Sequence, residues 1–377
     1  MFKFKAIESD FCGTPILKVT PTRSAKHYDK NIVFPIFQAQ QKTCELRDTS
    51  KTDYKYYVEG VLLMIIGTFG IIGNISAIVV FTRQSLQKSF YGLMLSLAVF
   101  DLIFIITVIF GFGIPSLSPE FKDTAIYQSS FFWTRTLANT AMMGSVYFTM
   151  AITIERYVTV CHPFYRVSHS WPTKRLVLLL VAFATLYNIP TFFELEWIEK
   201  CELLKDGNNS TYYVLKNTAM RDDETYIQIY KTWLPLMLRL FGPYGLLITL
   251  NALIVRELVR SSNHLPVIVI SGPGLDHALN QRRKEIVLAK VSLAIVFVFI
   301  LCHSLMWIFK FCELICPIKW YSEWKRPEWI LITENFSHLA LVFSSSVNFY
   351  IYLGKHWRTI FNIPESREQP QIELQES

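Results

Sequence analysis

The sequence predicts an all-α membrane protein: a seven-transmembrane helix bundle with an extracellular N-terminus and a short cytoplasmic C-terminal helix and tail. Hydrophobic residues make up 51% of its 377 residues and charged residues only 18%, where a soluble chain has about 25% charged residues. Apolar runs of about 20 residues, the length a helix needs to cross a bilayer, recur through most of the chain. One of these runs carries a strong cation at each end of a single crossing.

Seven runs qualify as membrane spans. Helices are expected in all of them, because backbone polar groups in lipid must be satisfied within their own segment. The runs cover 61–81, 90–113, 131–160, 176–193, 232–255, 286–312 and 329–353. The chain then divides into an extracellular tail (1–56), the bundle (57–353) and a cytoplasmic helix and tail (354–377).

Two observations bear on orientation. The loops expected inside, together with the segment after the last span, carry 12 Lys and Arg residues, and the loops expected outside carry 9. This small difference leaves orientation open on charge alone. Overlapping glycosylation acceptor sequences at Asn208 and Asn209 favour an extracellular loop 194–231. The N-terminal tail has no apolar h-region, so no cleaved signal peptide is expected there.

The first, second and seventh spans carry polar side chains where lipid would penalise them. A carboxylate at mid-membrane normally faces the bundle interior, a water cavity or an ion, and Asp101 occupies such a position. A cluster of Asn74, Asp101, Ser345 and Asn348 would satisfy all four side chains. Two interpretations stay open. The cluster is either purely structural, or it is a hydrated site that holds a sodium ion and rearranges between two states.

The third span is the helix around which we expect the others to pack. Its two arginines, Arg135 and Arg156, are 21 residues apart. That separation is about 32 Å along a helix, close to the thickness of the hydrocarbon layer. Arg156 belongs to the triplet Glu155-Arg156-Tyr157 at the inner end. We expect a signal to pass along this helix.

These motifs, in this order, resemble those of rhodopsin-like (class A) G-protein-coupled receptors, and the resemblance covers about residues 57–361. The matching residues are Gly73-Asn74, Leu97 to Asp101, Glu155-Arg156-Tyr157, Pro243, Phe299, Cys302, Asn348 and Tyr352. Within the family, the segments ERYVTVCHPF, YNIPTFFE and SSSVNFYIY are most similar to invertebrate neuropeptide receptors of the FMRFamide type.

The resemblance implies a multi-pass plasma-membrane receptor that binds an extracellular neuropeptide and activates a heterotrimeric G protein, with arrestin as a further partner. Glu155 would hold Arg156 at rest and release it on activation, and Tyr157, Asn348 and Tyr352 would belong to the same switch. Glu285, at the start of the sixth span, is placed to be a second partner of Arg156. The alternative is an acid that interacts with the dipole of its own helix.

The chain also departs from the family. The outer end of the third span has no cysteine, so the usual bond to the second extracellular loop cannot form. We expect Cys201 to pair with Cys44 instead, with Cys12 as second choice. In the sixth span, the sequence Cys302-His303-Ser304-Leu305 lacks the family's Trp and Pro. His303 either takes the role of the aromatic toggle or is a satisfied core histidine.

The ligand is to be read from the outer halves of the helices. Ala138 stands where amine receptors carry an Asp, which argues against a monoamine. The acidic second outer loop would attract a cationic peptide. The pocket candidates are Arg135, Asn139, Glu194, Arg239, Lys310, Glu313, Glu334 and His338.

These candidates carry both signs of charge. Glu313 and Glu334 suit an arginine of the ligand. The cations either neutralise these two acids or select a ligand with an acidic group. We favour an amidated peptide with a basic residue. The alternative is an orphan or constitutively active receptor for a non-peptide or acidic ligand.

Other function classes fit less well. A seven-span transporter or channel would also carry charges in the membrane, but it would be expected to show paired repeats, and none is found. The sequence has no HExxH or GxSxG motif, so no enzyme activity is expected. The only ion or cofactor considered is the sodium ion near Asp101.

Overall fold

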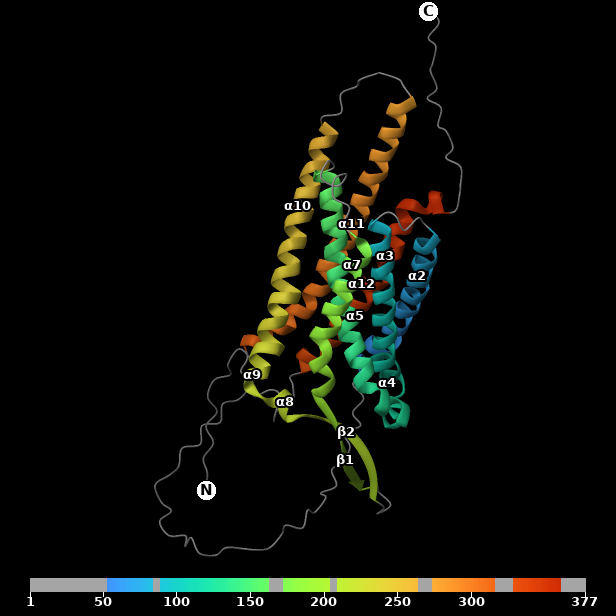
Figure 1. The fold of residues 1–377 in the computed structure, drawn as a ribbon. Helices are drawn as coiled ribbons and strands as arrows, with labels where there is room; N and C mark the ends of the chain where they lie inside the picture. Colours follow the sequence, from blue (N-terminus) through green and yellow to red (C-terminus); the bar gives the residue numbers. More distant parts are fainter. Residues whose placement is uncertain are drawn as a thin grey trace, which may run out of the picture.

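The structure is a computed structural model that describes residues 53–83, 89–162, 172–203, 209–263, 273–315 and 328–360. Within these ranges seven helices are long and apolar enough to cross a membrane, which confirms the predicted fold class (Figure 1). The spanning segments are Tyr56–Arg83, Ser89–Leu117, Ala125–Cys161, Thr173–Phe193, Glu224–Arg260, Glu285–Trp307 and Ile332–Gly354. The predicted boundaries of the tail (1–56) and of the C-terminal segment (354–377) stay predictions.

Several spans are built from more than one helical type. The first four spans and their leading turns comprise α1 (Asp53–Lys55), η1 (Tyr56–Leu62), α2 (Leu63–Arg83), α3 (Ser89–Val108), η2 (Ile109–Gly113), α4 (Ile114–Leu117), η3 (Pro119–Asp123), α5 (Ala125–Cys161), α7 (Thr173–Asn188) and η4 (Ile189–Phe193). The rest comprise α8 (Ala219–Asp222), α9 (Glu224–Tyr226), η5 (Ile227–Trp233), η6 (Leu236–Phe241), α10 (Gly242–Asn263), α11 (Pro273–Ile315) and α12 (Glu328–Ile360).

The segment between the fourth and fifth spans is more ordered than the loop predicted for it. Strands β1 (Leu195–Leu203) and β2 (Asn209–Asn217) form an antiparallel pair, with Leu195 opposite Asn217. The hairpin projects beyond the bundle at the end where α8 and α9 lie (Figure 1). The fifth span begins at Glu224, earlier than the predicted residue 232. The prediction places the start too late because the first two turns of the span mix apolar and charged residues.

Helix α5 is the central helix of the bundle, as predicted. In its most apolar stretch 67% of the residues are buried inside the bundle, against 17–50% in the other six spans. Close packing depends on Gly144, because a Cβ there would lie 2.1 Å from a ring carbon of Phe100 on α3. In the first span, a Cβ on Gly70 would lie 2.1 Å from the Ser346 hydroxyl of α12. Small residues of this kind let membrane helices approach closely.

Three of the spans contain π-helical turns: η1 in the first, η2 in the second, and η5 with η6 in the fifth. A π turn changes the direction in which the following side chains point, and such turns occur often at functional sites. All four segments lie in the half of the bundle that carries the β-hairpin. That half contains the cavity described next.

Candidate functional site

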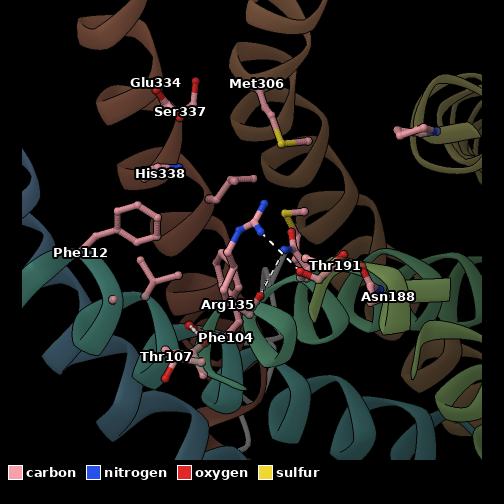
Figure 2. A pocket seen from close by; sticks show the side chains of 18 of the residues that line it. Phe104, Thr107, Phe112, Arg135, Asn188, Thr191, Met306, Glu334, Ser337 and His338 are labelled. Carbon is pink, nitrogen blue, oxygen red and sulfur yellow. Dashed lines mark hydrogen bonds between the residues drawn. The ribbon is translucent and has the colours of Figure 1, made fainter. Parts of the chain in front are cut away.

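A cavity of about 460 Å³ opens among the outer halves of the helices. Its inner part is apolar and includes Phe104, Met142, Met306 and Leu341. Figure 2 shows Arg135 reaching across the cavity from α5 toward Thr191, while Glu334, Ser337 and His338 lie on the wall formed by α12. An apolar cavity with a few polar groups at fixed positions is the usual form of a ligand site.

One wall of this cavity is basic, and we call its four cations, Arg135, Arg221, Lys231 and Arg239, the basic wall. Three of them converge on a single carboxylate, that of Glu194. Glu194 Oε2 lies 2.8 Å from Arg135 and 2.7 Å from Arg221, and its Oε1 pairs with Lys231. Arg239 instead donates to Asn188 Oδ1 at 3.0 Å.

The local fold holds Glu194 in place. Helix α7 tightens into the 3₁₀ segment η4, which ends one residue before Glu194. The Thr218 backbone N–H donates to the Glu194 carbonyl at 3.0 Å, and the Tyr226 hydroxyl donates to Oε1 at 2.9 Å. Burial would raise the pKa of this carboxyl, but the charges of Lys231 and Arg135 outweigh it and hold the pKa below its ordinary value. Glu194 is therefore ionised, although its side chain is fully buried.

The opposite wall is acidic. Glu334 and His338 line the cavity from α12, and His338 Nδ1 lies 3.0 Å from Oε1 of Glu59. Glu59 is only 1% exposed, and Lys55 is 3.8 Å from its carboxylate. Sequence analysis missed Glu59. Glu59 precedes the predicted first span (61–81), so the sequence does not mark it as an intramembrane acid. In the structure the span begins at Tyr56 and includes it, and an acid inside a span points to a site by default.

Some of the predicted pocket residues line the cavity and others do not. Arg135, Asn139, Arg239, Glu334 and His338 line the cavity, and the Asn139 amide donates to its own helix at the Arg135 carbonyl. Their role in ligand binding stays a prediction. Glu194 does not line the cavity. It lies behind the basic wall as its counter-ion, which corrects its assignment as a lining residue.

One of the two alternatives has the cations neutralise Glu313 and Glu334, but the carboxylate that pairs with Arg135 is that of Glu194. The side chains of Lys310 and Glu313 lie outside the described part of the structure. Sequence analysis also left Arg221 and Lys231 out of the site. Both lie within the loop predicted at 194–231. In the structure the early start of the fifth span brings Lys231 to the cavity, and the short helix α8 that precedes the span brings Arg221 there.

The mid-membrane polar residues come together below the cavity. Asp101 is fully buried and accepts hydrogen bonds from Ser145 at 2.7 Å and from the Asn348 amide at 2.7 Å. Asn74 donates to the Ser345 backbone carbonyl at 3.0 Å rather than to Asp101. Both carboxylate oxygens thus have donors, and the structural interpretation is sufficient in this conformation.

The sodium interpretation also has some support. Asn74 Oδ1 is buried without a hydrogen-bond partner, and the neighbouring groups offer oxygen donors, which hard cations prefer. Asp101, Ser145 and Asn74 are the residues that would hold such an ion. A bound ion would there compensate a buried carboxylate charge.

At the inner end of α5, Arg156 is 1% exposed and bound on several sides. Its guanidinium lies 2.5 Å from Glu155 Oε2 and 2.7 Å from Glu285 Oε2, and its Cζ lies 4.3 Å from the ring centroid of Phe90. The pair with Glu285 joins the third span to the sixth. Two carboxylates and an aromatic face hold this cation inside the bundle.

Two other predicted switch residues, Tyr157 and Tyr352, have the following contacts. Tyr157 contacts His162 through its hydroxyl at 3.1 Å. The buried ring of Tyr352 packs on Phe81 at a centroid distance of 5.0 Å. Their roles in activation stay predictions.

In the sixth span, His303 is buried and stacks on Phe299, with ring centroids 4.0 Å apart. This arrangement matches the core-histidine interpretation. Trp307, one turn farther out, lines the cavity and is 4% exposed. An aromatic residue is therefore present at the cavity's inner end, although it is not at the position where the family usually has one.

Aromatic contacts occupy the place of the missing disulfide. Trp197 on β1 donates its Nε1–H to the Gln128 carbonyl at 2.9 Å, and its ring packs on Phe131 and Phe132 of α5. Cys44 and Asn208 lie outside the described residues, as do the side chains of Cys201 and Asn209. The predicted disulfide and the glycosylation sites stay predictions.

Comparison with known proteins gives a consistent result. Residues 73–352 match the family described as 7 transmembrane receptor (rhodopsin family). The chain is 31% identical to an FMRFamide receptor of Drosophila melanogaster, over 84% of this chain and 56% of that protein. It is 25% identical to an FMRFamide peptide receptor of Caenorhabditis elegans, over 77% and 64% of the two chains.

A Gq-coupled rhodopsin of Mizuhopecten yessoensis is 26% identical over 72% of this chain. The chain spans between about half and two thirds of the length of these relatives. The match extends from the first span to the seventh, and the motifs of the polar cluster and the inner arginine lie within it. The chain therefore belongs to the rhodopsin family of seven-transmembrane receptors, which are multi-pass plasma-membrane proteins and not enzymes.

Proposed function

We propose that this protein is a receptor for an extracellular, amidated neuropeptide with a basic residue, and that it activates a heterotrimeric G protein. The observation that carries the proposal is the cavity itself. It lies in the outer half of the bundle, and α5, which lines it through Arg135, Ala138 and Asn139, continues to Arg156 at the inner face. The proposal also draws on the two similar proteins named as FMRFamide receptors.

The acidic wall supports a basic group on the ligand. Glu334 lines the cavity, and the carboxylate of Glu59 lies behind His338. A guanidinium that reached this wall would form charge-assisted hydrogen bonds, which are about twice as strong as neutral ones. The Phe112 ring packs against the His338 ring at a tilt, with ring centroids 4.4 Å apart, and adds an aromatic surface for apolar side chains of a peptide.

Coupling is proposed to depend on the pair of Arg156 with Glu285. This pair closes the inner face between α5 and α11. Outward movement of α11 would break it and expose the guanidinium to the G protein, and helix displacement of this kind is a common switching transition. Arrestin is proposed to bind the same opened face.

The test is activation of G proteins in cells that express the chain, with FMRFamide as the first of a panel of amidated peptides. Each peptide is compared with its free-acid form and with a form in which Arg is replaced by norleucine. We expect at least one amidated peptide to activate the receptor, with potency lowered in both altered forms. Activation by no peptide of the panel, or equal potency of all forms, contradicts the proposal.

A further inference from the structure

The basic wall contains more positive charge than the acids in the described part of the structure compensate. Four cations line the cavity on this side, and the acids that face them are Glu194 behind the wall and Glu334 across the cavity. Glu194 forms ion pairs with Arg135, Arg221 and Lys231 and with no fourth cation among the described residues. Two positive charges remain in a cavity that is otherwise largely apolar.

Among the described residues, Arg239 is the cation of the basic wall that pairs with no carboxylate. Its contacts are the Asn188 amide oxygen at 3.0 Å and the face of Tyr187, whose ring centroid is 5.2 Å from its Cζ. Its Nε is buried and has no hydrogen-bond partner in the described structure, and the same holds for the Nε of Arg221. A charge inside a membrane span is costly, so an uncompensated one usually marks a binding site.

The unusual form of the fifth span aims this charge at the cavity. Ile227, Lys231, Pro235 and Arg239 all line the cavity although they follow one another at intervals of four residues. In a regular α-helix, three such steps would turn the last side chain by roughly 120° from the first. The π turns of η5 and η6 widen the helix and compensate this rotation. They thereby align Lys231 and Arg239 on one face.

We infer that the basic wall is a subsite for an anionic group of the ligand, a carboxylate or sulfate, which binds Arg239 and neighbouring cations. The inference rests on the proposed function and extends it. The peptide would carry its basic group toward Glu334 and an anionic group toward Arg239. Guanidinium groups match carboxylate and sulfate oxygens in geometry as well as in charge.

The first experiment uses a matched peptide pair: FMRFamide extended at its N-terminus by Asp or by Asn. At the parent receptor the Asp peptide is expected to be about tenfold more potent, a difference that corresponds to one charge-assisted contact. Arg239→Gln should abolish the difference, and Arg239→Lys should retain part of it. Equal potency of the two peptides at the parent, or an undiminished difference at Arg239→Gln, overturns the inference.

The control variant separates local binding from long-range attraction. Lys216 lies exposed on β2 and does not line the cavity. Lys216→Gln therefore removes one outer cation without changing the wall, and the difference between the peptides should persist. If Lys216→Gln reduces it as much as Arg239→Gln does, general steering explains the preference and the subsite does not exist.

The second experiment needs no active peptide, so the inference can be judged even if the proposed function fails. The thermal stability of purified receptor is measured in sulfate and in chloride at equal ionic strength. Sulfate should stabilise the parent and Lys216→Gln more than it stabilises Arg239→Gln. An equal effect on all three proteins identifies a general salt effect, and it would reject an anion site at Arg239.

Discussion

The carboxylate of Glu285 lies 2.7 Å from the guanidinium of Arg156, and this contact joins the sixth span to the third at the inner face of the bundle. The two residues are 129 positions apart, so the folded bundle alone brings them together. Arg156 is almost fully buried and Glu285 is partly exposed. An outward movement of α11 would thus remove one of the two carboxylates and leave the arginine with Glu155.

This geometry predicts that Glu285→Ala raises signalling in the absence of ligand. The substitution removes a contact that the proposed outward movement of α11 would break, and a loss of about 1 kcal/mol would shift the closed–open equilibrium about fivefold. The measurement is basal G-protein activation, normalised to the amount of receptor at the surface. Glu257→Ala, which removes an inner acid that does not contact Arg156, should leave it unchanged. A Glu285→Ala receptor no more active than its parent would mean that the pair is no lock.

The polar cluster predicts a test that separates its two interpretations. If sodium binds near Asp101, sodium chloride should stabilise the purified receptor relative to choline chloride, by about 1.4 kcal/mol at ten times the dissociation constant. Asp101→Asn removes the charge but keeps a side chain of similar shape, and it should remove this dependence. Thermal unfolding of both proteins in the two salts provides the measurement. A parent receptor with equal stability in both salts would leave only the structural interpretation.

Much of this arrangement could be predicted from sequence. Hydropathy locates the seven spans, and the polar side chains within them predict the contact of Asp101 with Asn348. The pair of Arg156 with Glu285 is one of two alternatives that the family resemblance suggests, and the structure shows the contact. Asp101 and Asn348 lie well inside long helices, where an error of a few residues in a boundary does not change the face on which a side chain lies.

The basic wall could not be predicted in the same way. Lys231 falls in a predicted loop because the charged residues in the first turns of the fifth span lower the mean hydropathy of that segment. The ion pair of Arg135 with Glu194 depends on how η4 turns at the end of the fourth span. The orientation of Arg239 depends on π turns, which no hydrophobic period reveals. Such features are set by tertiary packing and not by local pattern.

The substitution Glu194→Gln, which hardly changes the shape of the side chain, is expected to lower the stability of the receptor strongly. Glu194→Gln leaves three cations, Arg135, Arg221 and Lys231, around a neutral amide. Removing one partner of a buried ion pair costs about 3–5 kcal/mol. We expect a marked fall in thermal stability and in the amount at the cell surface. Glu196→Gln, at an exposed position of β1, should have little effect, and comparable losses in the two variants would contradict the role of Glu194 as counter-ion.

The lowered pKa of Glu194 also fixes how this contribution depends on pH. A carboxyl whose pKa is lowered by folding stabilises the protein fully above its ordinary pKa of 4.5, and the contribution is lost as pH falls through the lowered value. The Glu194 contribution to the stability difference between the parent and Glu194→Gln should therefore be lost only in strong acid, as the pH falls below about 4.5. A difference that disappears already between about pH 6 and pH 5 would show that Glu194 is protonated there and that its pKa is not lowered. Thermal unfolding across this range measures it.

Two glycines in membrane helices predict opposite sensitivities to the same substitution. A Cβ at Gly144 would meet Phe100 at 2.1 Å, whereas a Cβ at Gly245 would have no atom within 4 Å. Gly144→Ala should destabilise the receptor by about 1–3 kcal/mol, because overpacking pushes α3 away from α5. Gly245→Ala should be neutral or slightly stabilising, since alanine favours a helix. Thermal unfolding of the two variants decides, and a stable Gly144→Ala receptor would show that the two helices can separate at little cost.

The last prediction concerns how the β-hairpin is held without a cysteine on α5. Trp197 packs on Phe131 and Phe132 and donates to the Gln128 carbonyl, so Trp197→Ala removes both the aromatic contact and the hydrogen bond. The expected cost is about 1–3 kcal/mol for a partly buried aromatic residue, seen as lower thermal stability and lower peptide potency. Trp197→Phe keeps a ring and loses only the hydrogen bond, so its effect should be intermediate. The matched control is Trp133→Ala, because Trp133 is 63% exposed and does not contact the hairpin tryptophan. If Trp197→Ala is no more harmful than this control, the aromatic contacts do not anchor the hairpin, and the predicted disulfide of Cys201 becomes the principal anchor to test.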